Sequence, residues 1–145
     1  MKNAIFPGSF DPIHGGHIDI IKRASKLFDN LYIVVSVNIS KKSKPLKERY
    51  LETKKVVDNL KLKNVKVFMN ENFTIDFANK HKCKYIVRSL RDTKDFKYEL
   101  TMAQSNYKLE SNLETILFFS NPSLTNISSH AIREIQKNMK VLKKD

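Results

Sequence analysis

Short apolar runs alternate with segments of helical periodicity along most of the chain. Five runs predict strands, and several of them are rich in β-branched or aromatic residues: 4–6, 31–37, 65–69, 84–87 and 115–119. Helical spacing of apolar residues is found between or after these runs, over about 18–28, 47–60, from about 74, 95–109 and beyond an N-cap at Ser128 or Ser129. Because strands and helices alternate through short connections, the sequence predicts an α/β fold with a doubly wound (Rossmann-like), five-stranded parallel sheet and helices on both faces.

The 145 residues suit a single domain, 1–145, with no interior linker and a basic C-terminal tail, 137–145, that we expect to fray. Cys83 is the only cysteine, so it cannot form an intramolecular disulfide, and we expect it to be a small buried hydrophobic residue. The N-terminus lacks the apolar run of a signal peptide, and no run approaches the roughly 18 apolar residues of a membrane span. These features predict a cytoplasmic location. The predicted first helix places its apolar residues on one face: Ile18, Ile21, Ala24, Leu27 and Phe28.

The chain is strongly basic, with 27 Lys+Arg against 15 Asp+Glu, a net charge of +12 and a pI near 9.8. A charge of this sign favours polyanionic partners, either nucleic acid or small phosphorylated molecules. The lysines are spread over the predicted helices and several of the loops, and many aromatic residues lie in apolar strand runs. This distribution argues against a nucleic-acid-binding module, although weak, salt-dependent binding of nucleic acid would be a natural side effect.

All three glycines lie in one predicted strand-to-helix turn, the segment 6–17, which reads FPGSFDPIHGGH. Glycine there permits a positive φ and a close approach of a ligand to the backbone. The helix that follows offers free N–H groups and the positive end of its dipole, which together favour phosphate binding. His14 and His17 are three residues apart, so they face the same ligand if the helix begins near Gly15.

Three further loops follow predicted strands, where ligands of open parallel sheets bind. The first, 40–45, reads SKKSKP and is basic. The second carries Arg88 and Arg91 at the end of an apolar run, where arginine suits bidentate phosphate contacts. The third, 125–130, offers hydroxyl groups and backbone amides at the start of a helix. A solvated basic loop and a plain N-cap are the simpler readings of the first and third segments.

The residues Gly8-Ser9-Phe10-Asp11-Pro12, followed by His14-Gly15-Gly16-His17, resemble the G-[ST]-F-D-P and [HT]-x-G-H signature of the nucleotidyltransferase superfamily. Within it, Arg88-Ser89-Leu90-Arg91 and Asp95-Phe96-Lys97-Tyr98-Glu99 resemble the R-G-L-R and D-F-x-Y-E blocks of the phosphopantetheine adenylyltransferase family. Ile127-Ser128-Ser129 is similar to that family's I-S-S segment. The four loop segments, near 6–17, 40–45, 88–99 and 125–130, have the same order and separation as in that family, and the similarity covers about the first 135 residues.

The resemblance implies a reaction and a set of partners. ATP and 4′-phosphopantetheine would give dephospho-coenzyme A and pyrophosphate by direct in-line attack, with Mg²⁺ bound through the substrate phosphates and no metal site on the protein. The family usually forms a hexamer, so a homo-oligomer is expected, although this chain stops soon after Met139. Nicotinate mononucleotide adenylyltransferase is the alternative, but it lacks the two blocks around Arg88 and Glu99. A cytidylyltransferase would carry a different late motif from the one at 124–129.

The resemblance also implies roles for individual residues. The catalytic group would be His17, Ser9, Lys41 and Arg91. ATP would be bound by Ser9, Phe10, His17, Ser89, Leu90, Arg91 and Glu99, together with Leu124, Thr125, Asn126, Ile127, Ser128, Ser129 and His130. The phosphopantetheine would be bound by Ser9, Lys41, Thr74 and Arg88. Two of these positions depart from the family pattern, because Ser89 replaces a glycine and His130 stands where the family often has a third serine.

Overall fold

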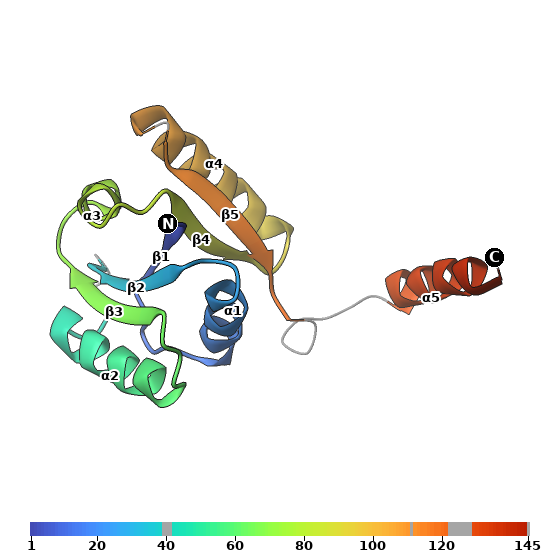
Figure 1. The fold of residues 1–145 in the computed structure, drawn as a ribbon, viewed down its shortest axis with the longest axis horizontal. Helices are drawn as coiled ribbons and strands as arrows, with labels where there is room; N and C mark the ends of the chain where they lie inside the picture. Colours follow the sequence, from blue (N-terminus) through green and yellow to red (C-terminus); the bar gives the residue numbers. More distant parts are fainter. Residues whose placement is uncertain (39–41, 111, 122–128, 145) are drawn as a thin grey trace.

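The computed structural model describes residues 1–38, 42–110, 112–121 and 129–144, and Figure 1 shows their arrangement. Strands and helices alternate throughout: β1 (Asn3–Gly8), α1 (Gly15–Ser25), β2 (Asn30–Ser36), α2 (Leu46–Asn59), β3 (Val65–Asn70), α3 (Thr74–Lys80), β4 (Tyr85–Leu90), α4 (Thr93–Leu109), β5 (Glu114–Phe119) and α5 (Ser129–Lys144). The sheet has the order β3-β2-β1-β4-β5, and each neighbouring pair is parallel. The predicted doubly wound, five-stranded parallel sheet is therefore confirmed.

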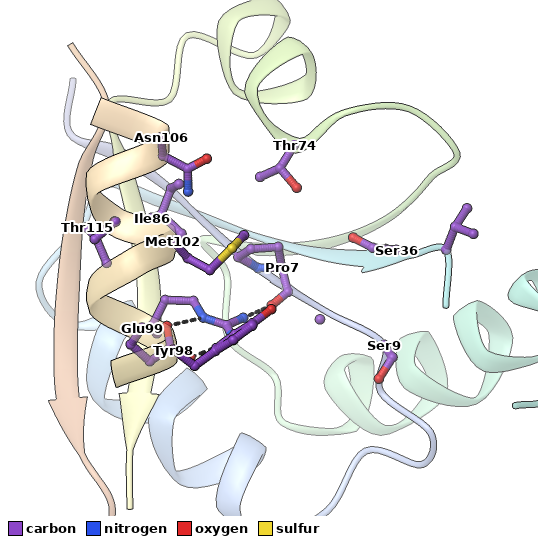
Figure 2. A pocket seen from close by; sticks show the side chains of 14 residues that line it. Pro7, Ser9, Ser36, Thr74, Ile86, Tyr98, Glu99, Met102, Asn106 and Thr115 are labelled. Carbon is purple, nitrogen blue, oxygen red and sulfur yellow. Dashed lines mark hydrogen bonds and ion pairs between the residues drawn. The ribbon is translucent and has the colours of Figure 1, made fainter. Parts of the chain in front are cut away.

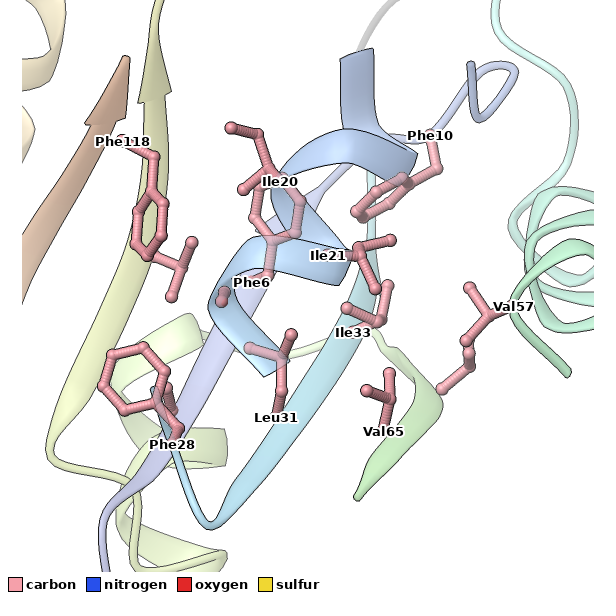
Figure 3. Packing of buried hydrophobic residues seen from close by; sticks show 14 of the residues in the cluster. Phe6, Phe10, Ile20, Ile21, Phe28, Leu31, Ile33, Val57, Val65 and Phe118 are labelled. Atoms are coloured by element: carbon pink, nitrogen blue, oxygen red, sulfur yellow. The ribbon is translucent and has the colours of Figure 1, made fainter. Parts of the chain in front are cut away.

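The two faces of the sheet carry separate hydrophobic cores. Alternate residues of the central strand β1 point to opposite faces, so Ala4 and Phe6 belong to one core and Ile5 to the other. The first core packs side chains of α1 and α2 against the sheet, as Figure 3 shows for Ile20, Ile21 and Val57. The second core contains residues of α3 and the turn after it, including Cys83, which is 5% exposed as expected.

The central position of β1 places its carboxyl end between those of β2 and β4. Register pairs Gly8 with Val35 of β2, and β4 lies on the other side of β1. The strand order switches direction here, because β2 and β3 extend one way from β1 and β4 and β5 the other. In open α/β sheets this switch point is where ligands bind. The fold thus brings together the loops after β1, β2 and β4.

One expectation about the first helix was wrong. Leu27 is 63% exposed, so its assignment to the buried face was wrong: α1 ends at Ser25, and Leu27 lies in the following turn, which buries Phe28 instead. Helix α5 continues to Lys144 and includes most of the basic tail. Figure 1 shows α5 apart from the layers that enclose the sheet. Within the described ranges, no helix combines the length and the apolar character that crossing a membrane requires.

Candidate active site

In the turn after β1, glycine is required at Gly8 and Gly16 because neighbouring rings leave little room for a side chain, and not because the backbone adopts a positive φ there. None of the three glycines has a positive φ, contrary to expectation; the left-handed residue is Phe10, with φ 48°. A Cβ on Gly8 would lie 3.2 Å from the Phe10 ring, and a Cβ on Gly16 would lie 2.9 Å from Cε1 of His14. The Phe10 ring is buried (2% exposed), with its centroid 4.8 Å from that of His17. Contact between Phe10 and a nucleotide would therefore involve its backbone.

His14 and His17 cap the N-terminus of α1 reciprocally. Nδ1 of His14 accepts a hydrogen bond from the backbone N–H of Gly16, and Nδ1 of His17 accepts one from the backbone N–H of His14, both at 3.1 Å. This is a capping box in which two imidazoles replace the usual hydroxyl and carboxylate. An Nδ1 that accepts cannot carry the proton, so the neutral His17 ring bears its hydrogen on Nε2.

His17 stays neutral at physiological pH. Burial lowers its pKa to about 4, and electrostatic interactions with His14 and Arg88 act in the same direction. The two histidine rings lie 3.9 Å apart between centroids. His17 is therefore a fixed neutral donor, through Nε2–H, at the positive end of a helix.

Arg88 joins three elements at the switch point. Its Nε and Nη2 donate to the two carboxylate oxygens of Glu99 at 2.9 and 2.8 Å, and its Nη1 donates to the carbonyl oxygen of Pro7 at 3.0 Å. Glu99 is 5% exposed, so this bidentate pair from β4 to α4 is largely withdrawn from water. The pair holds the guanidinium at the carboxyl end of β1, beside the signature turn.

Arg91 lies on the surface at the start of α4. Its Nε and Nη2 donate to Asp95 at 3.0 and 3.2 Å, while Asp92 caps the helix by accepting from the N–H groups of Lys94 and Asp95. The Arg91 guanidinium holds the pKa of Asp95 below its ordinary value. The Arg91 side chain is 68% exposed, so it can contact a ligand from outside.

A cavity of about 340 Å³, here called the Thr74 cavity, opens between the ends of β1 and β2 and the face of α4. It is lined by Ser9, Thr74 and Arg88, the three described residues that the resemblance assigned to the phosphopantetheine. Figure 2 shows Thr74 at the start of α3 and Asn106 on α4 pointing toward each other across it. Residues far apart in the sequence thus meet around one cavity.

A second cavity of about 370 Å³, here called the histidine cavity, adjoins the first. It is lined by His14, His17, Ser89 and Arg91, and three of these carry a predicted ATP contact. The two cavities share Arg88, Tyr98 and Glu99 as a common wall. The site therefore has two compartments, which fits a reaction between two substrates whose reacting groups must meet at a boundary.

Comparisons with known proteins decide the family. The chain matches the cytidylyltransferase-like family over residues 5–135. It is 44% identical over 137 residues to a phosphopantetheine adenylyltransferase of Malacoplasma penetrans, covering 94% of this chain and 91% of that protein. It is 42% identical over 143 residues to one of Bdellovibrio bacteriovorus, covering 98% and 88%. The chain belongs to the phosphopantetheine adenylyltransferase family.

Solved structures confirm the fold at greater distance. A putative nicotinate-nucleotide adenylyltransferase of Vibrio parahaemolyticus matches with a TM-score of 0.63 at 17% identity, covering 92% of this chain and 80% of that one. A pantoate-β-alanine ligase of Francisella tularensis matches with a TM-score of 0.60 at 15% identity, covering 99% and 72%. At these identities the likeness is one of fold alone.

Several site residues that the family resemblance assigned cannot be placed. Lys41 and the segment 124–128 (Leu124, Thr125, Asn126, Ile127 and Ser128) lie outside the described residues. Ser129 and His130 are the first two residues of α5, described here by their backbone. Leu90 is the last residue of β4, and Ser89 lines the histidine cavity.

Apart from Glu99, which was assigned to ATP, the residues of α4 that line the Thr74 cavity received no individual role in the sequence interpretation. Tyr98, Met102 and Asn106 follow one another at intervals of four, so they project from one face of the helix toward the cavity. That spacing was visible in the sequence. It was missed because largely apolar side chains at helical spacing ordinarily indicate the buried face of a helix. In this member of the phosphopantetheine adenylyltransferase family these side chains line a cavity instead.

The donor groups of the site suit anionic ligands. Within residues 1–38, 42–110, 112–121 and 129–144, no cluster of three His, Cys, Asp or Glu side chains could hold a metal ion. The two carboxylates that line the cavities, Glu99 and Asp95, already accept hydrogen bonds from Arg88 and Arg91. Burial raises the pKa of the Cys83 thiol to about 12, so it has neither thiolate character nor a place in the site.

Proposed function

We propose that this chain transfers the adenylyl group of ATP to 4′-phosphopantetheine, giving dephospho-coenzyme A and pyrophosphate. The main support is the coincidence of two facts: relatives at 44% and 42% identity are named phosphopantetheine adenylyltransferase, and expected substrate residues line two adjoining cavities. In this proposal the phosphopantetheine occupies the Thr74 cavity and ATP the histidine cavity.

The proposed step is an in-line displacement. An oxygen of the acceptor phosphate attacks the α-phosphorus of ATP, a new P–O bond forms, and the bond from the α-phosphorus to the bridging oxygen breaks, so that its electron pair leaves with pyrophosphate. A phosphate monoester has its second pKa near 6 and is mostly dianionic at neutral pH, so the attack needs no general base. The protein must instead hold two anions together and stabilise the charge that develops.

The described residues fit these tasks. His17 would donate a hydrogen bond through Nε2–H to the α-phosphate. Its ring stays neutral at working pH, because burial lowers its pKa to about 4. Arg88 stands in the wall between the cavities, where both phosphates would meet. Ser9 lies at the end of β1 and Arg91 at the exposed mouth of the histidine cavity. Lys41 and Ser128–Ser129 keep their proposed phosphate contacts from the family resemblance.

Magnesium enters this proposal with the substrate, as MgATP. The donor set of the described residues offers arginines, histidines and amides but no free group of carboxylates, so we propose that the ion is held by the nucleotide phosphates. We also propose a cytoplasmic location and a homo-oligomer, with a hexamer as in the family. Exposed apolar side chains on α4 and β5, such as Phe96, Leu100 and Phe119, supply a surface for assembly.

The test is pyrophosphate release from MgATP with three acceptor conditions: 4′-phosphopantetheine, nicotinate mononucleotide and no acceptor. We expect turnover with 4′-phosphopantetheine only, and dephospho-coenzyme A as the product by mass spectrometry. Turnover with the mononucleotide alone would overturn the proposed acceptor, and turnover with neither would overturn the proposed reaction.

A further inference from the structure

Arg49, on the first turns of α2, is a buried arginine that the proposed function does not use. It is 2% exposed. Its Nε donates to the carbonyl oxygen of Lys44 at 2.8 Å, and its Nη1 donates to those of Ser9 at 2.7 Å and Ser36 at 2.8 Å. One guanidinium therefore binds three carbonyl groups from three separate segments.

These three carbonyls lie where the chain leaves β1, leaves β2 and approaches α2. Ser9 and Ser36 both line the Thr74 cavity, so Arg49 is behind the wall of that cavity. Besides its carbonyl contact with Arg49, Lys44 makes two further contacts. Its backbone N–H donates to Asp11 at 3.3 Å, and its Nζ forms an ion pair with Glu52 at 3.1 Å. The guanidinium thus ties the signature turn and the end of β2 to one fixed point on α2.

The charge of Arg49 distinguishes it from the other arginines at this edge of the sheet. Arg23, Arg88 and Arg91 each form an ion pair with a carboxylate, whereas Arg49 forms none with any residue that the structure describes. Its partners are neutral carbonyl dipoles, which stabilise the cation without cancelling its charge. Burying a cation without a carboxylate costs stability, and a positive charge in a region of low dielectric constant acts strongly on nearby anions.

We propose that Arg49 is a positioning residue for the acceptor phosphate. Its guanidinium fixes Ser9 and Ser36 in the wall of the Thr74 cavity, and its unneutralised charge lies directly behind them, where it attracts the dianion that enters. The two contributions are separable. A lysine would keep the positive charge but could not donate to all three carbonyl groups in the same geometry. A methionine would keep a similar volume but would lose the charge and the hydrogen bonds. This proposal rests on the assignment of the acceptor to that cavity.

The experiment compares Arg49→Lys and Arg49→Met with the unmodified protein in the pyrophosphate-release assay. We expect the KM for 4′-phosphopantetheine to rise about tenfold or more in Arg49→Met, and by less in Arg49→Lys, because a charge-assisted interaction is lost or weakened. The KM for MgATP should change less than about threefold in both. Binding of pantetheine, which has the same arm and lacks the phosphate, should be unaffected by removal of the charge when measured by calorimetry.

Thr53→Val is the matched control, because Thr53 is fully buried on the same helix one turn beyond Arg49. It should leave both KM values unchanged. Equal KM values in the arginine variants and the unmodified protein would overturn the proposal, as would a loss shared equally by 4′-phosphopantetheine and pantetheine. Failure of the conservative Arg49→Lys to fold would also overturn it, since that would make the residue a requirement of folding only. An unmodified protein that does not turn over 4′-phosphopantetheine would count against the proposed function instead.

Discussion

At the scale of single residues, the reciprocal cap of His14 and His17 decides what the histidine pair can do. The two Nδ1 atoms are occupied by backbone N–H groups, so each neutral ring presents Nε2–H as a donor. A histidine with this tautomer donates a hydrogen bond to a phosphate oxygen at any pH above its own pKa. The same contacts that begin the helix thus orient the donor that the proposed reaction uses.

Replacing His17 tests this donor. His17→Ala should lower kcat by about 10²–10³-fold, the range typical of a lost transition-state donor. His14→Asn should cost less than about tenfold, because asparagine also accepts the N-cap hydrogen bond. Stopped-flow or coupled pyrophosphate assays at saturating substrate would measure both. Near-full activity of His17→Ala would contradict the role assigned to the imidazole.

The lowered pKa of His17 also predicts how stability depends on pH. The folded pKa is about 4 and the ordinary value is 6.5, so the unfolded chain binds this proton first as the pH falls. The stability is fully present above pH 6.5 and is lost as the pH falls toward 4, with about 2 kcal/mol at most lost between pH 7 and 5. Urea unfolding at both pH values, in the unmodified protein and in His17→Gln, would measure it. An equal loss in the two proteins would show that other groups cause it.

At the scale of elements, α2 buries two polar side chains, Arg49 and Thr53. The Oγ1 atom of Thr53 is buried and has no hydrogen-bond partner among the described residues. Valine has the same shape without the hydroxyl, so Thr53→Val should raise the free energy of unfolding by about 1 kcal/mol. Thermal or urea denaturation would measure this. A decrease in stability would mean that the hydroxyl has a partner in solution, such as a bound water.

The elements themselves were largely predictable, whereas their side-chain contacts were not. The order and type of the elements could be predicted from strand and helix periodicity, because apolar runs and helical spacing reflect which side chains are buried. The packing of Gly8 and Gly16 against Phe10 and His14 could not be predicted, because it depends on rings from neighbouring positions in a turn. Nor could the three carbonyls around Arg49, which are brought together only by the sheet order.

The segment with Arg88 and Arg91 shows the same limit at the site. The sequence placed Arg88 and Arg91 at a strand end and predicted that they contact phosphate. The structure gives them Glu99 and Asp95 as ion-pair partners, of which Glu99 had been assigned to ATP. Its bidentate contact with Arg88 shows that Glu99 orients the arginine in the wall between the cavities. Helical spacing alone could not have paired residues 88 and 99 across two elements.

At the scale of the whole molecule, the net charge of +12 has a more specific meaning than general basicity. Most of it is lysine on surfaces, where the solvent and salt screen it. Two arginines line the cavities and are fixed by carboxylates, Arg88 by Glu99 and Arg91 by Asp95. Arg49 lies behind the wall of the Thr74 cavity and is fixed by three carbonyl groups. The surface excess would help to attract two polyanionic substrates, and the fixed arginines would orient them.

The central claim is that the two adjoining cavities separate the acceptor from ATP. The most direct measurement is the pair of Michaelis constants, for 4′-phosphopantetheine and for MgATP, in two variants. Asn106→Ala, in the Thr74 cavity, should raise the KM for 4′-phosphopantetheine and leave that for MgATP within about twofold, and Arg91→Gln, in the histidine cavity, should do the reverse. Parallel changes in both constants, or the opposite assignment, would contradict the account.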